Sequence, residues 1–255
     1  MSLSRTVVLI TGAAQGLGLA AATRLASKGA YIGVVDLLEE KAHELCKTLG
    51  DRSIPLVLDV TSENDMQNAV NTIVNKWGKL DVVVNCAGIS PPMRTLNKKG
   101  QPHNLEQFKK VLNVNTVGTF NVIRLAAEKM ALNKGDSDGR KGVIINTASI
   151  AAMDGQIGQA AYAASKGAIV SMTLPIARDL SSFGIRVCTI APGLFMTPMM
   201  EGLPEQVKSD LAKTVPFPKR LGVPDEYALL VESIINNPML NGETIRLDGA
   251  LRMQP

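Results

Sequence analysis

The sequence predicts a single-domain α/β fold of the Rossmann-like type, in which a doubly wound parallel sheet carries helices on both faces. Short apolar, β-branched segments alternate with amphipathic, alanine-rich segments along the whole chain, which is typical of this class. The apolar segments are continuous rather than alternating, so we expect strands that are buried on both faces and paired in parallel. With 255 residues, the chain is long enough to bury a sizeable core.

The elements follow one another in a regular order from the N-terminus. The expected strands are residues 6–10, 31–35, 54–58, 82–84, 143–146, 186–190 and 244–247. The expected helices in the first half are residues 16–28, 39–49, 62–77 and 105–115, and each later strand also has a helical segment before it. No low-complexity linker or internal repeat interrupts this order, so residues 1–255 are expected to form one domain.

Two long polar loops, residues 90–104 and 133–142, stand out from this pattern. Residues 90–104, together with residues 194–215, are expected to border the substrate, because long loops of α/β folds are often lids or binding elements. Residues 133–142 lie between a helix and a strand and are interpreted as a solvated insertion, with a binding role as the alternative.

Composition and charge exclude several classes of protein. The formal net charge of +4 is compatible with anionic partners such as nucleotides or acyl-CoA, but it does not demand nucleic acid. Aromatic residues make up only 4% of the chain, which disfavours a protein that stacks single-stranded bases. No uncharged run is long enough to cross a membrane. Few residues precede the first strand, so we expect no signal peptide, with a processed or uncleaved organelle signal as the alternative.

The cysteines and histidines predict neither disulfides nor a metal site. Cys46, Cys86 and Cys188 are odd in number, widely spaced and without a C-x-x-C pair, which favours a reducing compartment. His43 and His103 are far apart and lack metal-ligand spacing, so no metal is expected.

A glycine-rich loop with the spacing G-x-x-x-G-x-G directly follows the first strand. Gly12 permits a tight turn, Gly16 lets the backbone approach a pyrophosphate, and Gly18 lets the helix pack near the sheet. The N-terminus of that helix offers free N–H groups and the positive end of its dipole to phosphate. The loop therefore predicts a dinucleotide site, with turn chemistry alone as the alternative.

The second strand leads into Asp36, which lies 18 residues after Gly18. A carboxylate at this place accepts hydrogen bonds from the adenosine ribose hydroxyls and repels a 2′-phosphate. Leu37 and Leu38 follow it, and no arginine is adjacent to attract that phosphate. We therefore expect NAD rather than NADP; the alternative role for Asp36 is a helix N-cap.

Small and polar residues follow the third and fourth strands. Asp59 and Val60 come after the third strand, and Cys86, Ala87 and Gly88 come after the fourth. In parallel sheets the carboxyl ends of the strands meet at the edge where ligands bind. These residues are therefore expected to approach the adenine and ribose, with simple turn chemistry as the alternative.

Tyr162 and Lys166 are spaced to share one face of a helix. A tyrosine normally titrates near 10, and a neighbouring ammonium group favours the phenolate and lowers the pKa. The pair is thus a candidate for acid–base catalysis, whereas a surface Tyr/Lys pair is the ordinary alternative.

Two further polar residues are candidates for the same site. Ser149 follows the strand 143–146, so its hydroxyl is expected at the ligand edge, where it can hydrogen-bond a substrate carbonyl; a helix cap is the alternative. No acid–histidine partner for a serine nucleophile is evident. Asn115 falls in the helix predicted over 105–115, and a buried polar role or simple surface exposure is expected for it.

These motifs occur in a fixed order along the chain. They are T-G-x-x-x-G-x-G, an acidic end to the second strand, N-x-A-G, Asn115, Ser149, Y-x-x-x-K and Pro192-Gly193. In this set and order the chain resembles the short-chain dehydrogenase/reductase family over nearly its full length. The resemblance implies an NAD-dependent oxidoreductase acting on a CH–OH group. Cys86 departs from the pattern, because many family members carry a second asparagine there.

The resemblance also implies roles for individual residues. Ser149 positions the substrate oxygen, Tyr162 transfers its proton and Asn115 holds a water in a proton relay. Lys166 binds the nicotinamide ribose and lowers the pKa of Tyr162. The implied cofactor contacts are Gly12, Gln15, Gly16, Leu17, Gly18, Asp36, Asp59, Val60, Cys86, Ala87, Gly88, Tyr162, Lys166, Pro192, Gly193, Phe195 and Thr197.

Longer stretches are similar to one subgroup of the family. They are LNKKGQPH, GTFNVIRL, GVIINTAS, PFPKRLG and the ending DGALRMQP. The similarity implies oxidation of short-chain, including branched, 3-hydroxyacyl-CoA to 3-ketoacyl-CoA and the reverse reaction, by a mitochondrial homotetramer that tolerates hydroxysteroids. A cytoplasmic location stays open. In the family the helix over 160–180, rich in alanine and glycine here, forms a subunit interface.

The basic loop 90–104 is expected to contact the substrate. Arg94, Lys98 and Lys99 can meet the phosphates of CoA, with a solvated basic loop as the alternative. Gln156 and Gln159, shortly before the catalytic tyrosine, are expected to orient the acyl group. Two other functions remain open. One is a hydroxysteroid or other secondary-alcohol dehydrogenase; the other is an additional scaffold role in mitochondrial tRNA processing, which only analogy with the family supports.

Overall fold

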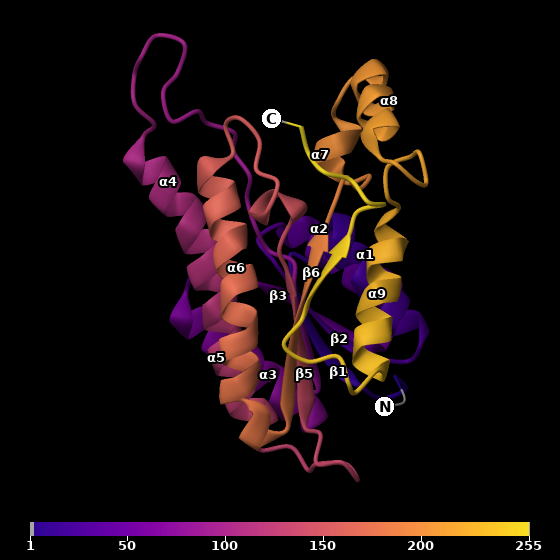
Figure 1. Cartoon of the computed structure of the whole chain (residues 1–255). Helices are drawn as coiled ribbons and strands as arrows, with labels where there is room; N and C mark the ends of the chain where they lie inside the picture. Colours follow the sequence, from indigo (N-terminus) through magenta and orange to yellow (C-terminus); the bar gives the residue numbers. More distant parts are fainter. Residues whose placement is uncertain (1–2, 255) are drawn as a thin grey trace.

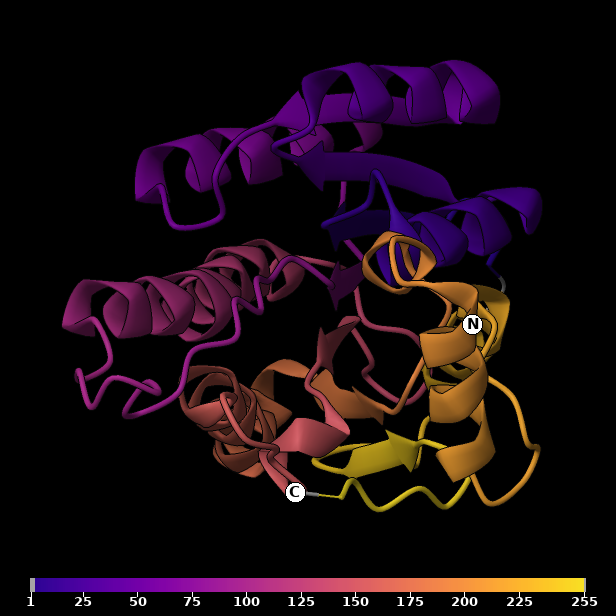
Figure 2. The same ribbon diagram turned by 90° about the horizontal axis from the view of Figure 1, so that it is seen from above.

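Seven parallel strands form one sheet in the order β3-β2-β1-β4-β5-β6-β7. The structure, a computed structural model, describes residues 3–254, and for Met199 only the backbone. The strands are β1 (Val7–Thr11), β2 (Tyr31–Asp36), β3 (Ser53–Val57), β4 (Val82–Asn85), β5 (Gly142–Thr147), β6 (Ile185–Pro192) and β7 (Thr244–Leu247). Figure 2 shows the N-terminal strands toward one end of the sheet and β7 at the other.

Helices cover both faces of the sheet (Figure 1). They are α1 (Gly16–Ser27), α2 (Glu39–Leu49), α3 (Glu63–Trp77), α4 (Leu105–Leu112), α5 (Thr119–Met130), α6 (Ala160–Asp179), α7 (Pro198–Glu201), α8 (Glu205–Thr214) and α9 (Pro224–Asn236). Side chains of α1, α2 and α9 pack in the core on one face, and those of α3, α5 and α6 pack in the core on the other. The predicted doubly wound α/β fold is therefore confirmed.

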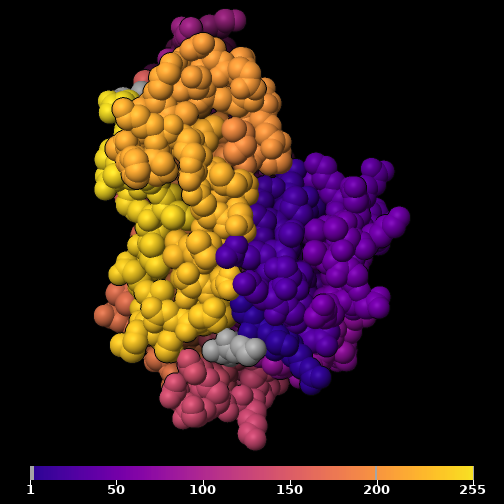
Figure 3. All heavy atoms as spheres, turned by 90° about the vertical axis from the view of Figure 1, so that its right-hand side faces the viewer, coloured from indigo at the N-terminus to yellow at the C-terminus, as the bar shows by residue number. Residues whose placement is uncertain are grey.

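The central strands are buried along their whole length. Every residue of β1, β4, β5 and β6 is buried, because apolar side chains on both faces meet a helical layer. The continuous apolar strands of the sequence have this physical cause. Figure 3 shows the C-terminal third packed beside the N-terminal segment, where Arg24 of α1 forms ion pairs with Asp225 and Glu232 of α9.

The strand order places the site. The chain proceeds outward from β1 to β3 and then returns to β4 on the other side of β1, so the connections diverge between β1 and β4. Parallel sheets bind ligands in the crevice that such a divergence leaves at the carboxyl ends of the strands. The segment 90–104, α7 and α8 all rise above this edge (Figure 1).

Two segments differ from the sequence predictions. The helix expected over 105–115 ends as an α-helix at Leu112 and continues as a π-helix, Asn113–Gly118. The expected loop 194–215 contains the helices α7 and α8. Helix α6 continues through Pro175 without a break, although proline removes one backbone hydrogen bond. Among the described residues, no helix is long and apolar enough to cross a membrane.

Candidate active site

The three glycines of the first loop form a cradle that side chains would fill. Gly12 has φ of +63°, and a Cβ there would lie 2.8 Å from the backbone nitrogen of Ala87. Gly16 has φ of +57°, a conformation that favours glycine. A Cβ on Gly18 would clash with the Gly12 carbonyl oxygen, so this glycine lets α1 begin directly against the turn. This close approach of backbone fits a bound pyrophosphate.

Asp36 holds the glycine loop from the end of β2. One carboxylate oxygen accepts the backbone N–H of Ala14 at 2.9 Å, and the other accepts that of Leu38 at 3.0 Å. The alternative of a helix N-cap is wrong, since the N-cap of α2 is Leu38, which makes no side-chain cap. The carboxylate is therefore fixed beside the loop, and its remaining lone pairs can accept ribose hydroxyls.

The remaining adenine-side residues lie around this cradle. Gln15 is exposed at the start of α1 and accepts a hydrogen bond from Lys41, while Leu17 packs on the core. Asp59 accepts from the backbone and hydroxyl of Thr61. The carbonyl of Val60 accepts from Asn121 at 2.9 Å. Asp59 and Val60 lie beyond the end of β3. This strand ends at Val57, one residue earlier than the sequence predicted.

The end of β4 contributes Cys86, Ala87 and Gly88. The backbone N–H of Cys86 bonds the Thr11 carbonyl at 3.0 Å, and that of Ala87 bonds the Thr11 hydroxyl at 3.3 Å. A Cβ on Gly88 would lie 3.5 Å from Lys166 Nζ. The residues after β4 therefore lie between the end of β1, where the glycine loop begins, and Lys166 of α6.

Tyr162 and Ser149 meet at the start of α6. Ser149 lies just beyond β5, where its hydroxyl accepts the backbone N–H of Ala151 at 3.1 Å and caps a short 3-10 helix. Burial raises the pKa of the Tyr162 hydroxyl, and a hydrogen bond with Ser149 acts in the opposite direction. The structure thus places the Ser149 and Tyr162 side chains next to each other.

Lys166 lies one helical turn after Tyr162 and is buried. Its ammonium group lies 5.8 Å from the centroid of the tyrosine ring and donates to the Thr147 carbonyl at 2.7 Å. Burial lowers the pKa of Lys166 to about 8. The sequence predicted that Lys166 lowers the pKa of Tyr162; in the structure burial raises this pKa instead.

Asn115 is fully buried within the π-helix. Its amide donates to the Ile89 carbonyl and to the Ser165 hydroxyl, both at 2.9 Å, and its side-chain oxygen accepts from the Ile89 N–H at 2.8 Å. The prediction of a buried polar role is confirmed. Both amide hydrogens are used in this way, so a water in a relay would have to donate to an oxygen atom of this residue.

The segment after β6 borders the opposite side of the edge. Pro192 ends β6, and a Cβ on Gly193 would lie 2.8 Å from Asp248, so only glycine fits there. The Phe195 ring is buried against Gly222, which leaves only its main chain for a cofactor. Thr197 lies about 3.6 Å from the Cβ position of Gly16, which brings this segment to the glycine loop.

The model of the family described as short chain dehydrogenase matches residues 6–208, which include both the glycine cradle and the Ser149–Tyr162–Lys166 group. The chain belongs to the short-chain dehydrogenase family. As a member of this family it is an oxidoreductase that uses a nicotinamide cofactor. The cradle, with its left-handed glycines and the fixed carboxylate of Asp36, fits such a cofactor.

Several relatives match this short-chain dehydrogenase over its whole length. The 3-hydroxyacyl-CoA dehydrogenase type-2 of Drosophila melanogaster is 58% identical over 99% of the chain and 100% of the relative. The human enzyme of that name is also 58% identical, over 100% of the chain and 98% of the relative. A solved 3-hydroxyacyl-CoA dehydrogenase type-2 from Mycobacterium avium superposes with a TM-score of 0.95 at 40% identity, covering 100% of this chain and 98% of that one.

A second solved structure bears on the cofactor. The 3-ketoacyl-(acyl-carrier-protein) reductase of Brucella melitensis, complexed with NADH, superposes with a TM-score of 0.87 at 28% identity. The alignment covers 99% of this chain and 100% of that one. The similarity supports the nicotinamide cofactor of this family member.

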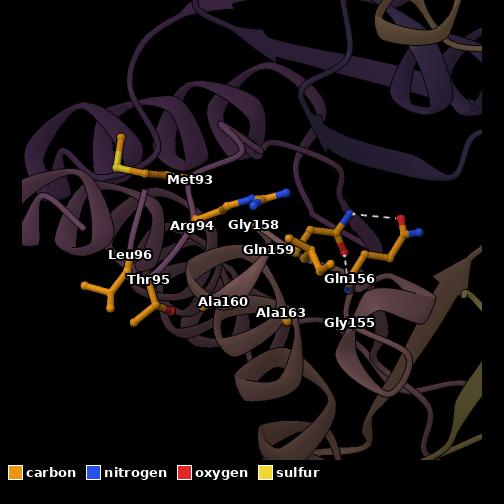
Figure 4. A pocket seen from close by; sticks show the side chains of 11 residues that line it. Met93, Arg94, Thr95, Leu96, Gly155, Gln156, Gly158, Gln159, Ala160 and Ala163 are labelled. Carbon is orange, nitrogen blue, oxygen red and sulfur yellow. Dashed lines mark hydrogen bonds between the residues drawn. The ribbon is translucent and has the colours of Figure 1, made fainter. Parts of the chain in front are cut away.

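A cavity of about 470 Å³ opens beside the start of α6 (Figure 4). Of the residues predicted to contact the substrate, Arg94, Gln156 and Gln159 line it, whereas Lys98 and Lys99 do not. These two lysines are exposed on a hairpin that the bridge between Leu96 and Pro102 closes. The cavity lies beside the catalytic helix rather than over its tyrosine, because Ala163 and not Tyr162 lines it.

Sequence reasoning missed several residues that complete the site. Thr147 holds Lys166 through its carbonyl, and its hydroxyl bonds the hydroxyl of the fully buried Tyr227 at 2.7 Å. Tyr227 also lies 3.4 Å from the sulfur of Cys86. No local motif marks Tyr227, since α9 brings it to the site from a distant part of the chain. Within residues 3–254, no cluster of three or more His, Cys, Asp or Glu side chains could hold a metal ion.

Proposed function

We propose that this chain oxidises short-chain, including branched, 3-hydroxyacyl-CoA to 3-ketoacyl-CoA with NAD, and catalyses the reverse reduction. The observation that carries the proposal is the meeting of the Ser149, Tyr162 and Lys166 side chains with the glycine cradle at one sheet edge. The full-length similarity to enzymes named 3-hydroxyacyl-CoA dehydrogenase type-2 supports the substrate class.

The proposed chemistry begins with a proton on the substrate hydroxyl. Ser149 orients this hydroxyl by a hydrogen bond, and the Tyr162 phenolate accepts its proton as the carbonyl forms. When bound, the nicotinamide accepts the hydride that leaves the carbinol carbon. Lys166 supplies positive charge beside the tyrosine, and Asn115 holds the Ile89 backbone close to the helix. In the reduction, Tyr162 returns the proton.

Asp36 supports NAD as the nicotinamide cofactor rather than NADP. Its carboxylate is held at the end of β2 by two backbone N–H groups. A fixed negative charge at this place accepts ribose hydroxyls and repels a 2′-phosphate. The next residue, Leu37, is exposed and apolar, so it offers no cation to that phosphate.

The cavity beside α6 supports a substrate larger than a simple alcohol. The segment of residues 93–96 forms one side of it and residues 155–160 form the other. The exposed guanidinium of Arg94 at its mouth can pair with a phosphate in two parallel hydrogen bonds. We assign the cavity to part of the CoA moiety, and Gln156 and Gln159 to the wall that orients it.

We also propose a homotetramer. Helices α5 and α6 border a groove of about 310 Å³ whose lining includes Phe120, Leu180 and Phe183. Large apolar side chains are exposed nearby, with Phe120 at 47% and Phe183 at 49% accessible. An apolar surface of this kind on adjacent helices is typical of an interface between copies. Sedimentation at several protein concentrations tests the oligomeric state.

The mitochondrial location that we propose rests on the sequence resemblance described above. Imaging of the tagged chain in cells tests it, and a purely cytoplasmic signal would contradict it.

The acyl-CoA dehydrogenase activity itself is tested by following NADH consumption with acetoacetyl-CoA and longer 3-ketoacyl-CoA substrates. The assay is repeated with NADPH and with a steroid ketone. The proposal expects the highest kcat/KM with a short acyl-CoA and NADH; a higher kcat/KM with the steroid ketone would favour a hydroxysteroid dehydrogenase.

A further inference from the structure

The chain ends in a segment that lies along the catalytic loop. After β7, residues 248–254, here called the C-terminal tail, turn back toward the loop that joins β5 to α6. The amide nitrogen of Gln156, in that loop, donates to the main-chain carbonyl of Gln254 at 2.8 Å. A residue predicted to orient the substrate is therefore itself held by the last described residue of the chain.

An arginine clamp fixes the path of the tail. Arg246, at the end of β7, bonds Asp154 of the catalytic loop at 2.6 Å and Asp248 of the tail at 2.7 Å. The same guanidinium donates to the Leu251 carbonyl at 2.8 Å. Asp154 and Asp248 are only 15% and 7% accessible. Because charges that are this buried and mutually paired are costly to separate, the clamp holds tail and loop in one arrangement.

The tail also has an apolar anchor. Leu251 is only 2% accessible and packs in a small cluster with Ile150 and Val215. Ile150 directly follows the catalytic Ser149, and Val215 directly follows α8. The tail thus joins the two segments that border the substrate side of the sheet edge.

The contact with Gln254 continues into the cavity wall. Gln159 accepts the backbone N–H of Gln156 at 3.1 Å, and its amide lies 3.5 Å from the Gln156 side-chain oxygen (Figure 4). Both glutamines line the cavity that also holds Arg94. The position of this wall therefore depends on the carbonyl that the tail presents to Gln156.

We propose that residues 252–254 of the tail determine substrate affinity by positioning the Gln156–Gln159 wall of the acyl-CoA cavity. This inference rests on the proposed function, because it assigns the cavity to the CoA substrate. The tail residues act through Gln156 and need not touch the substrate themselves. The KM for acyl-CoA should therefore depend on the tail. The KM for NADH should not, because the cofactor cradle lies on the far side of the sheet edge.

The test compares the intact chain with a chain that ends at Met253. The shortened chain keeps the Arg246 clamp, the Arg252–Asp248 ion pair and the packing of Leu251 and Met253, but it lacks the Gln254 carbonyl. We expect its KM for acetoacetyl-CoA to rise about tenfold, as for the loss of one or two positioned hydrogen bonds. The kcat, the KM for NADH and the melting temperature should stay close to those of the intact chain. Gln254→Ala is the matched control, because it removes the side chain and keeps the carbonyl.

A double-mutant cycle separates positioning from general loosening. Gln156→Met removes the donor from the other side of the same contact, so shortening the tail should add little to the KM of that variant. If the intact chain is active and the shortened chain has the same KM for acetoacetyl-CoA, this inference is overturned while the proposed function stands. The same holds if the shortened chain loses kcat and NADH affinity as much as it loses affinity for acetoacetyl-CoA. An intact chain that does not turn over acetoacetyl-CoA would overturn the proposed function and this inference with it.

Discussion

The ammonium group of Lys166 donates to the main-chain carbonyl of Thr147 at 2.7 Å, so the catalytic helix is bound to the end of β5 through its lysine. Thr147 is bound in turn through its hydroxyl to Tyr227 of α9. The lysine is therefore held by elements on both faces of the sheet. Its burial lowers its pKa to about 8, so near neutral pH it is a desolvated cation.

This burial predicts a pH-dependent stability. The pKa of Lys166 is about 8 in the folded chain against 10.5 for an ordinary lysine. The unfolded chain therefore binds more protons between these values, and the folded state gains stability as the pH rises from 8 to 10.5. Compared with Lys166→Met, the wild type should gain up to about 3 kcal/mol in free energy of unfolding over this range.

Urea unfolding of both proteins at pH 7.5, 9 and about 10.5 measures the difference. The other titrating groups are shared by the two proteins, and their contributions cancel except that of Cys86, whose pKa the Lys166 charge lowers. Parallel pH profiles for wild type and Lys166→Met would show that the lysine is not desolvated in the folded state.

Removal of the Tyr162 hydroxyl should abolish turnover while leaving the cofactor cradle intact. General acid–base groups contribute about 10²–10⁴-fold, so Tyr162→Phe should reduce kcat by a factor in this range. Because burial raises the pKa of Tyr162, the oxidation rate of the wild type should rise with pH across the neutral range.

NADH binding, followed by its fluorescence, should be nearly unchanged in Tyr162→Phe. Ala164→Ser, on the same helix, is a control for general effects on α6. Near-normal turnover in Tyr162→Phe would falsify the catalytic assignment.

Replacing the carboxylate at the end of β2 should change the cofactor preference. Asp36→Asn removes the negative charge but keeps an oxygen for the Ala14 N–H. Leu37→Arg adds a cation at a position that is 67% accessible, where a longer side chain fits. The double variant should lose about tenfold in kcat/KM for NADH and gain in kcat/KM for NADPH, since charged hydrogen bonds are worth roughly 1.5–3 kcal/mol.

The single variant Leu37→Arg is the control for the added charge alone. If the double variant kept the wild-type preference for NADH, Asp36 would not be the residue that discriminates the two cofactors.

The basic loop divides into a residue at the cavity and residues remote from it. Arg94 lines the cavity, whereas Lys98 and Lys99 lie on the hairpin beyond it. Arg94→Gln should raise the KM for acetoacetyl-CoA about two- to fivefold, as expected for an exposed ion pair. The double variant Lys98→Gln/Lys99→Gln should change it less.

The difference in KM for acetoacetyl-CoA between the two variants should shrink at high ionic strength because exposed charges are screened. A steroid ketone, which lacks phosphates, serves as the control substrate. Equal effects of Arg94→Gln on both substrates would contradict a contact with CoA.

Glu226 should stabilise the fold in a way that acid removes. It pairs with Arg220 at 2.6 Å and accepts the backbone N–H of Val223 at 2.8 Å at the start of α9. The hydrogen bond with Arg220 lowers the pKa of Glu226 from 4.5 to about 2. A lowered folded pKa means that the stabilisation is complete above 4.5 and is lost as the pH falls toward 2.

Glu226→Gln should therefore reduce the free energy of unfolding at pH 7 by less than about 1 kcal/mol, because the pair is partly exposed and screened by solvent. The difference from wild type should narrow between pH 5 and 3. Chemical denaturation at these pH values measures it, and a difference that widens toward acid would contradict the assignment.

Local patterns in the sequence were sufficient for the sheet and the cofactor cradle. Continuous apolar strands can be buried only between two helical layers, and glycine spacing fixes a backbone turn within a few residues. The pairing of Tyr162 with Lys166 is equally local, because residues four apart share one helix face. These features depend on neighbours along the chain, which a single sequence displays.

The tertiary structure decided what distant segments do to one another. It buried Lys166 and partly buried Tyr162, so that desolvation moved both pKa values, and it turned the region around Asn115 into a π-helix. It also brought Tyr227 to Thr147, and the C-terminal tail to Gln156. Burial and long-range hydrogen bonds depend on how the elements pack in three dimensions, and no short-range pattern records that packing.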